Sequence, residues 1–190
     1  GVYNHRGVLG AMGRVIEMNP AQRITVNAVG EPGNRTFYAQ ARKGRDLVTL
    51  LCEKEQVREL CKVLEQMLEE LRTKFPKGAN FMQITADMDL EEPIVPEFRV
   101  GQLGLGYDED RDLVVIVAKE LSPDEDEENT TVARIFGTRA QMDALARHGM
   151  EVISRGRPIC PLCGKPMDPD GVGHGFCPRR NGHSDEIVFA

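Results

Sequence analysis

The chain has 190 residues, a net charge of −6, 41% hydrophobic residues and no tryptophan. This length fits one domain with an appendage or two small domains, and the hydrophobic fraction is sufficient for an aliphatic core. No apolar run is long enough to span a bilayer, so we expect no membrane partner. The negative charge and the scarcity of aromatic residues, 5% of the chain, argue against nucleic acid as a partner. A nucleic-acid partner is possible but weakly supported.

The first half of the chain has the periodicity of three strands followed by a helix. Residues 1–21 show no clear periodicity, and we expect an N-terminal arm there. Apolar and polar residues then alternate, which predicts strands over 24–28, 36–42 and 47–52. A turn at 31–34 separates the first two strands, because Pro and Gly occupy the positions that such turns favour. One apolar stripe with three- and four-residue steps predicts a helix over 53–72: Val57, Leu60, Cys61, Leu64, Met67, Leu68 and Leu71.

The pattern starts again after a linker, residues 76–96, that is rich in proline and acidic residues. Alternation from Phe98 to Tyr107 changes phase at Gly101, which predicts a β-bulge. A turn, a strand over 113–118 that is buried on both faces, and a strand over 132–136 follow. Thr138 and Gln141 form a capping-box pair, so we expect a helix over 138–153.

These elements predict an α+β fold in which two strand-strand-strand-helix halves share a mainly antiparallel sheet. The halves are residues 22–75 and 97–155, joined by the linker 76–96 within a core of 22–155. Matched positions in the two helices, such as Gln56 with Gln141, are separated by 85 residues, and we interpret the halves as an internal repeat.

The spacing of cysteines and histidines in residues 156–190 predicts a zinc-binding tail. Cys160 and Cys163 lie two residues apart on one turn, and His174 and Cys177 repeat that spacing. Three thiolates and one imidazole form a complete tetrahedral set, so the zinc is expected to be structural rather than catalytic. Such a short segment has almost no core of its own, and metal binding would supply its folding energy. His183 also has an acceptable spacing and is the alternative to His174.

The other cysteines of the chain are Cys52 and Cys61. Cysteines that cluster as metal ligands suit a reducing compartment, so we expect a cytoplasmic location. Cys61 lies within the apolar stripe of the first helix, and we interpret it as a small core residue.

Several stretches resemble an uncharacterised bacterial family, domain-of-unknown-function family 3090. They are Gly30–Phe37, Glu53–Val57, Glu97–Gly101 and the segment that ends in Cys177-Pro178-Arg179-Arg180-Asn181-Gly182. The resemblance covers about residue 20 to the end of the chain. It implies a histidine shortly before the third cysteine, which favours His174 as the ligand. It implies no known activity.

Two functions remain open on the sequence. The first is a non-catalytic, zinc-stabilised binding or adaptor protein whose tail presents a basic surface to an unknown protein: Arg155, Arg157, Arg179 and Arg180. The alternative is a protein or enzyme that binds a small molecule or phosphoester through polar groups in or beside strands: Arg35, Thr36, Tyr38, Gln40 and Arg99. No catalytic constellation stands out, so we expect binding rather than catalysis.

Overall fold

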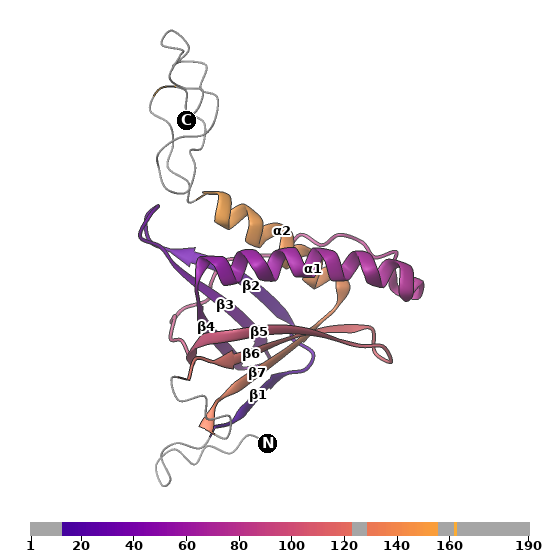
Figure 1. The fold of residues 1–190 in the computed structure, drawn as a ribbon, viewed down its shortest axis with the longest axis horizontal. Helices are drawn as coiled ribbons and strands as arrows, with labels where there is room; N and C mark the ends of the chain where they lie inside the picture. The colour runs from indigo at the N-terminus through magenta and orange to yellow at the C-terminus, as the bar shows by residue number, and fades with distance from the viewer. Residues whose placement is uncertain (1–12, 123–128, 156–161, 163–190) are drawn as a thin grey trace.

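The computed structural model describes residues 13–122, 129–155 and Leu162. Its elements follow in the order β1 (Val15–Met18), β2 (Arg23–Val29), β3 (Thr36–Lys43), β4 (Asp46–Cys52), α1 (Lys54–Lys74), a 3₁₀ turn η1 (Pro76–Gly78), β5 (Phe98–Asp108), β6 (Leu113–Glu120), β7 (Val132–Gly137) and α2 (Arg139–Arg155). The α+β class predicted from the sequence is confirmed. Both helices lie side by side across one side of a strongly curved sheet (Figure 1).

The sheet has seven strands in the order β1-β7-β6-β5-β4-β3-β2. Within each half the strands are antiparallel, and two parallel pairs, β4 with β5 and β1 with β7, join the halves. The register of β5 against β6 shifts between Val100 and Gln102, which is the bulge predicted at Gly101.

Strand β1 corrects the expectation of an arm over residues 1–21. Val15–Met18 pair in parallel with Val132–Ile135 of β7 and extend the sheet at its edge. A strand of four residues is too short to show a periodicity, and its partner lies in the other half of the chain. The first twelve residues of the predicted arm lie outside the described residues.

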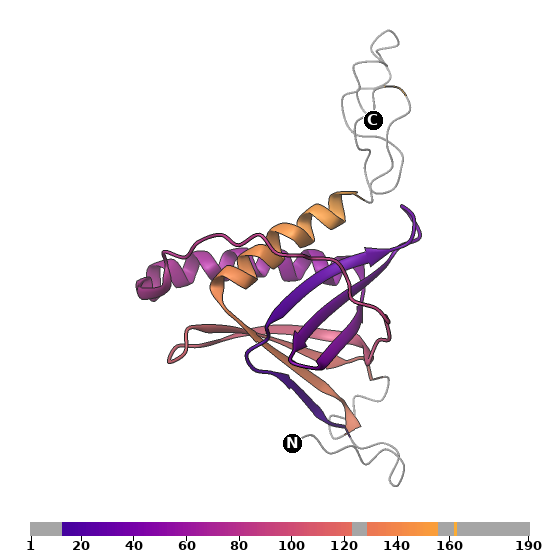
Figure 2. The same cartoon turned by 180° about the vertical axis from the view of Figure 1, so that it is seen from behind.

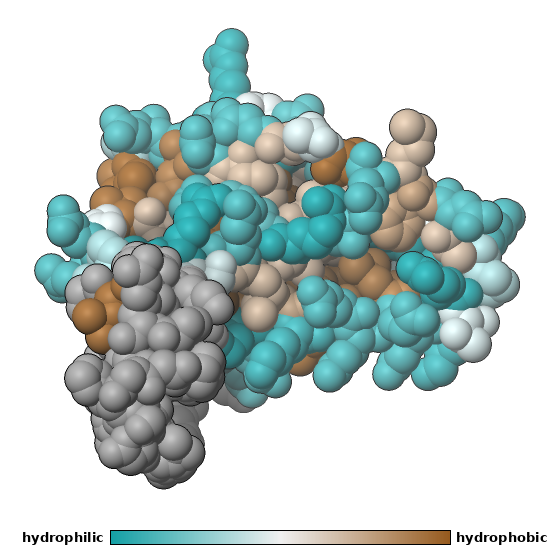
Figure 3. Space-filling view, turned by 90° about the horizontal axis from the view of Figure 1, so that it is seen from above, coloured by the Kyte–Doolittle hydropathy of each residue, from teal (hydrophilic) through white to brown (hydrophobic). Residues whose placement is uncertain are grey.

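The core lies between the sheet and the two helices. Leu64 of α1 and Leu145 of α2 are fully buried, and so is Cys61, as predicted. Gly149 of α2 makes the close approach of the helices possible, because a Cβ atom there would lie 2.3 Å from the Cys61 sulfur. The outward surface of the helix layer is mainly hydrophilic with smaller apolar areas, as the amphipathic stripe of α1 predicts (Figure 3).

The linker between the halves crosses the face of β2–β4 that the helices leave open (Figure 2). Thr25 and Asn27 both donate hydrogen bonds to the Met88 carbonyl, at 2.6 and 3.1 Å. Glu91 accepts hydrogen bonds from Arg42 at 2.9 Å, and this contact lowers the pKa of the Glu91 carboxyl. The polar side chains on this face therefore bind the chain's own linker.

A buried arginine fixes the start of α2. The Arg139 side chain is 3% exposed and donates to Asp112 Oδ1 at 2.8 Å, to the Phe75 carbonyl at 2.8 Å and to the Tyr107 hydroxyl at 3.2 Å. Asp112 has a φ of 52°, a conformation that aspartate tolerates better than most residues. This network joins α2 to the β5–β6 turn and to the end of α1.

Candidate functional site

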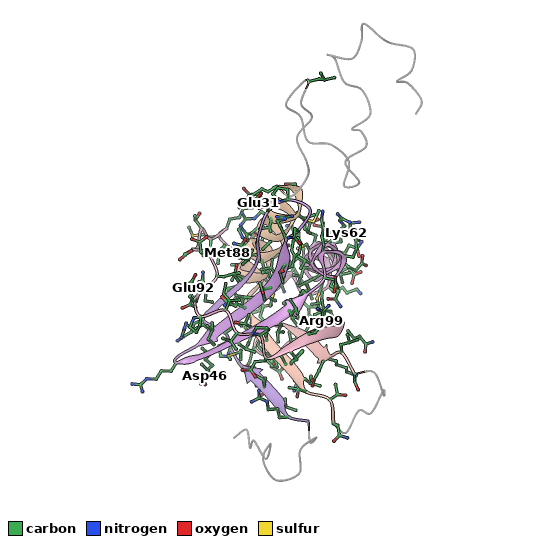
Figure 4. The ribbon with its side chains drawn as sticks, turned by 90° about the vertical axis from the view of Figure 1, so that its left-hand side faces the viewer. Glu31, Asp46, Lys62, Met88, Glu92 and Arg99 are labelled. Atoms are coloured by element: carbon green, nitrogen blue, oxygen red, sulfur yellow. The ribbon has the colours of Figure 1, made fainter. Side chains whose placement is uncertain are left out.

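A cleft of about 440 Å³ opens where β3 begins, β4 ends and α1 begins. Arg35, Thr36 and Arg99 line it together with Glu53 and Lys54. The structure thus brings three of the five predicted site residues to one cavity. Arg99 lies at the start of β5, well apart from Met88 and Glu92 of the linker (Figure 4).

The β2–β3 turn places Arg35 at the mouth of this cleft. The Asn34 amide donates to the Glu31 carbonyl at 2.8 Å, which closes the turn immediately before β3. Gly33 has a φ of 87°, which glycine adopts without strain. A Cβ atom there would meet nothing within 4 Å, so the space around Gly33 at the edge of the cleft is open.

The first turn of α1 forms the opposite wall. The Glu53 amide donates to Gln56 Oε1 at 2.8 Å, and the Glu53 side chain accepts from the backbone of that turn, so a capping box starts the helix at Lys54. Gln56 Nε2 donates to the Val100 carbonyl at 2.9 Å, which fixes the helix start against β5 beside Arg99.

Arg35 is held on two sides. Its guanidinium lies 4.8 Å from the centre of the Phe37 ring, and its Nη1 donates to the Val152 carbonyl of α2 at 2.9 Å. Burial, and next to it the positive charge of Arg155, lower the pKa of Arg35. An anion close to Arg35 would oppose this lowering of the pKa, because an opposite charge favours the charged form of the guanidinium.

Arg99 is more loosely held. Its Nη1 lies 2.7 Å from Glu53 Oε1, and the two side chains are 50% and 63% exposed. An ion pair this exposed contributes at most about 1 kcal/mol, so Arg99 can exchange its partner at little cost. Three cationic residues, Arg35, Lys54 and Arg99, therefore line the cleft. They lie beside one acidic residue at the N-terminal end of α1, where the helix dipole also favours an anion.

The two other predicted site residues lie elsewhere. Gln40 is 1% exposed and donates to Thr49 Oγ1 at 3.0 Å and to the Glu91 carbonyl at 2.9 Å, so it holds the linker. Tyr38 lies on the same face of β3 as Gln40, and neither residue lines the cleft. Glu53 and Lys54 were not predicted as site residues. The available signal in the sequence was the Glu53–Gln56 capping pair, which marks the start of the helix beside the cleft.

Cys52 also lines the cleft but is not a reactive thiol. It is 7% exposed, and burial raises its pKa to about 12. A thiol that stays protonated at neutral pH is a poor nucleophile. The cationic residues that line this cleft are suited to binding an anion rather than to nucleophilic catalysis.

The predicted zinc ligands Cys160, Cys163, His174 and Cys177, and the alternative His183, all lie outside the described residues. Within residues 13–122 and 129–155, no group of three or more His, Cys, Asp or Glu side chains is arranged to hold a metal ion. In the same part of the chain no helix is both long and apolar enough to cross a bilayer.

Comparison with known proteins agrees with the resemblance noted from the sequence. No curated protein and no solved structure matches the chain. A family model described as "Protein of unknown function (DUF3090)" matches residues 16–177, which is well over half of the chain. The chain therefore belongs to the DUF3090 family of proteins of unknown function.

Proposed function

We propose that this protein binds a small anionic ligand, a phosphate or carboxylate compound, in the cleft where β3 begins, β4 ends and α1 begins. The observation that carries the proposal is that Arg35, Lys54 and Arg99 line one cavity of about 440 Å³. Small-molecule sites have volumes of about 300–1,000 Å³, so the cavity has a suitable size. Guanidinium groups also bind phosphate and carboxylate through paired hydrogen bonds.

This proposal takes the second of the two functions that the sequence left open. The adaptor function depended on a basic surface near the tail. Of its four arginines, only Arg155 is among the described residues, and it pairs with Glu151 at 3.1 Å. Arg35 and Arg99 line one cleft, and this supports the ligand-binding function.

A phosphate titration tests the proposal. Phosphate is added at constant ionic strength, with chloride as the matched salt, and the thermal unfolding midpoint is followed. We expect a saturable rise for the wild type, because a ligand at 100 times its Kd stabilises the folded state by about 2.7 kcal/mol. Arg35→Ala and Arg99→Ala should lose most of this rise.

Arg72→Ala is the control, because it removes the same charge from the far end of α1, where the side chain is 61% exposed. It should retain the phosphate-dependent rise. An equal rise with chloride in the wild type, or an equal loss in Arg72→Ala, would contradict the proposal.

The same protein, in this proposal, carries a structural zinc ion in its tail and is located in the cytoplasm. The support is the spacing of Cys160, Cys163, His174 and Cys177, with His183 as the alternative fourth ligand. Four protein ligands leave no open coordination position, so the zinc would stabilise the tail and take no part in ligand binding.

The two halves, we also propose, arose by duplication. Each consists of three antiparallel strands followed by a helix. In addition, the first residues of β5 pair in parallel with β4, the last strand of the first half. Strand β1, which leads into β2, pairs in parallel with β7, the last strand of the second half. This correspondence of parallel pairs supports a repeat beyond the shared order of elements.

A further inference from the structure

The end of α2 lies beside the proposed anion site although no residue of α2 lines the cleft. The link is the hydrogen bond from Arg35 Nη1 to the Val152 carbonyl, which spans 117 positions of sequence. Val152 lies in the last turn of α2, which ends at Arg155, so this hydrogen bond joins the start of β3 to the end of the helix. A carbonyl oxygen has two lone pairs, so it can accept from Arg35 in addition to a backbone amide.

The same guanidinium has donors left for a ligand. An arginine side chain carries five N–H donors in a fixed planar arrangement, and Val152 occupies one of the two Nη groups. The Phe37 ring lies against the guanidinium and limits its rotation. An anion and the Val152 carbonyl can thus bind Arg35 at the same time, and each contact favours the side-chain position that the other requires.

Two charges near Arg35 act on it in opposite directions. Arg155, in the last turn of α2, repels Arg35, while the negative end of the helix dipole attracts it. A bound anion would reduce the repulsion between the two arginines, so it would stabilise the last turn of α2.

We infer that the last turn of α2 positions Arg35 for anion binding, so that occupancy of the cleft and order in Val152–Arg155 are thermodynamically coupled. This inference rests on the proposed function. The coupling is reciprocal: a ligand that stabilises the turn binds more weakly when the turn is destabilised. Val152 is a positioning residue in this arrangement and does not touch the ligand.

A matched pair of variants at Ser154 tests the coupling. This side chain is exposed and lies outside the cleft. Ser154→Ala and Ser154→Gly both remove the hydroxyl that donates to the Glu151 carbonyl at 2.8 Å. The two variants therefore differ from each other chiefly in the conformational freedom of the backbone. Glycine disfavours the helix relative to alanine, and the phosphate affinity of Ser154→Gly should be lower by about two- to fivefold. Ser154→Ala should bind phosphate at least as tightly as the wild type.

Hydrogen exchange gives the second measurement. Phosphate should slow amide exchange across Val152–Arg155 several-fold in the wild type and leave it unchanged in Arg35→Ala. Without phosphate, Arg35→Ala should exchange faster than the wild type in this turn. Equal phosphate affinities for the two Ser154 variants, or exchange in this turn that is insensitive to phosphate, would overturn the coupling alone. A wild type that binds no phosphate would overturn both the proposed function and the coupling.

Discussion

The contact between the two helices depends on the absence of a side chain at Gly149. A Cβ atom at this position would lie 2.3 Å from Cys61 Sγ and 3.1 Å from Val26 Cγ2. Carbon atoms in contact are normally separated by about 3.5–4.0 Å, so Gly149→Ala must displace α2 or force the Cys61 side chain out of place. Cys61 is fully buried and its side chain is short, which leaves little room for adjustment.

Two opposing effects set the size of the change. Alanine in place of glycine favours the helix by about 1 kcal/mol, whereas overpacking of a core costs about 1–3 kcal/mol. The clash is severe, so we expect Gly149→Ala to lower the free energy of unfolding by about 1–2 kcal/mol. The measurement is urea unfolding of the wild type and the variant.

The double variant Gly149→Ala/Cys61→Ala isolates the contact. Cys61→Ala removes the sulfur atom and leaves space for the new methyl group, so the double variant should be more stable than the sum of the single changes by about 0.5–3 kcal/mol. Burial raises the pKa of Cys61 to about 12, so the thiol is uncharged at neutral pH and the effect is one of packing. Gly149→Ala that is more stable than the wild type, or additive changes in the double variant, would refute this reasoning.

Three further predictions concern other parts of the chain. Asp112→Asn should lower the free energy of unfolding by about 1–3 kcal/mol because it removes the anionic partner of a buried arginine, while Asp110→Asn on the exposed turn should change it by less than about 0.5 kcal/mol; urea unfolding of both decides. Arg42 lowers the pKa of Glu91 in the folded state, so the stability that Glu91 contributes is fully present above its unfolded-state pKa and is lost as the pH falls through its folded-state pKa. Glu91→Gln should therefore flatten the acid side of the stability–pH profile, and an unchanged profile would contradict this prediction. Elemental analysis should find about one zinc per wild-type chain and markedly less in Cys163→Ser; a wild-type protein without zinc would refute the metal site.

The helices and most strands could be predicted from the sequence because their signals are local. The apolar stripe predicted a helix over 53–72, and α1 spans Lys54–Lys74. The Thr138–Gln141 capping box is present, with a hydrogen bond of 2.8 Å from the Thr138 amide to Gln141 Oε1. Such signals depend on residues three or four positions apart, so they can be recognised without knowledge of the tertiary structure.

What the sequence did not predict depends on contacts between distant segments. Strand β1 exists because β7 pairs with it, and Gln40 is buried because the linker covers its face of the sheet. Likewise, Arg35 and Arg99 could be named as candidates from their places beside strands. Only the folded chain shows that Lys54 joins them and that Gln40 belongs to another surface.

A crystal structure determined at a saturating phosphate concentration tests the central claim most directly. We expect one phosphate in the cleft, with its oxygens within hydrogen-bond distance of the Arg35 guanidinium and of Lys54 or Arg99. We also expect the hydrogen bond from Arg35 to the Val152 carbonyl to persist beside the bound ion. Phosphate bound elsewhere while the cleft stays empty, or a site in which Arg35 takes no part, would contradict it.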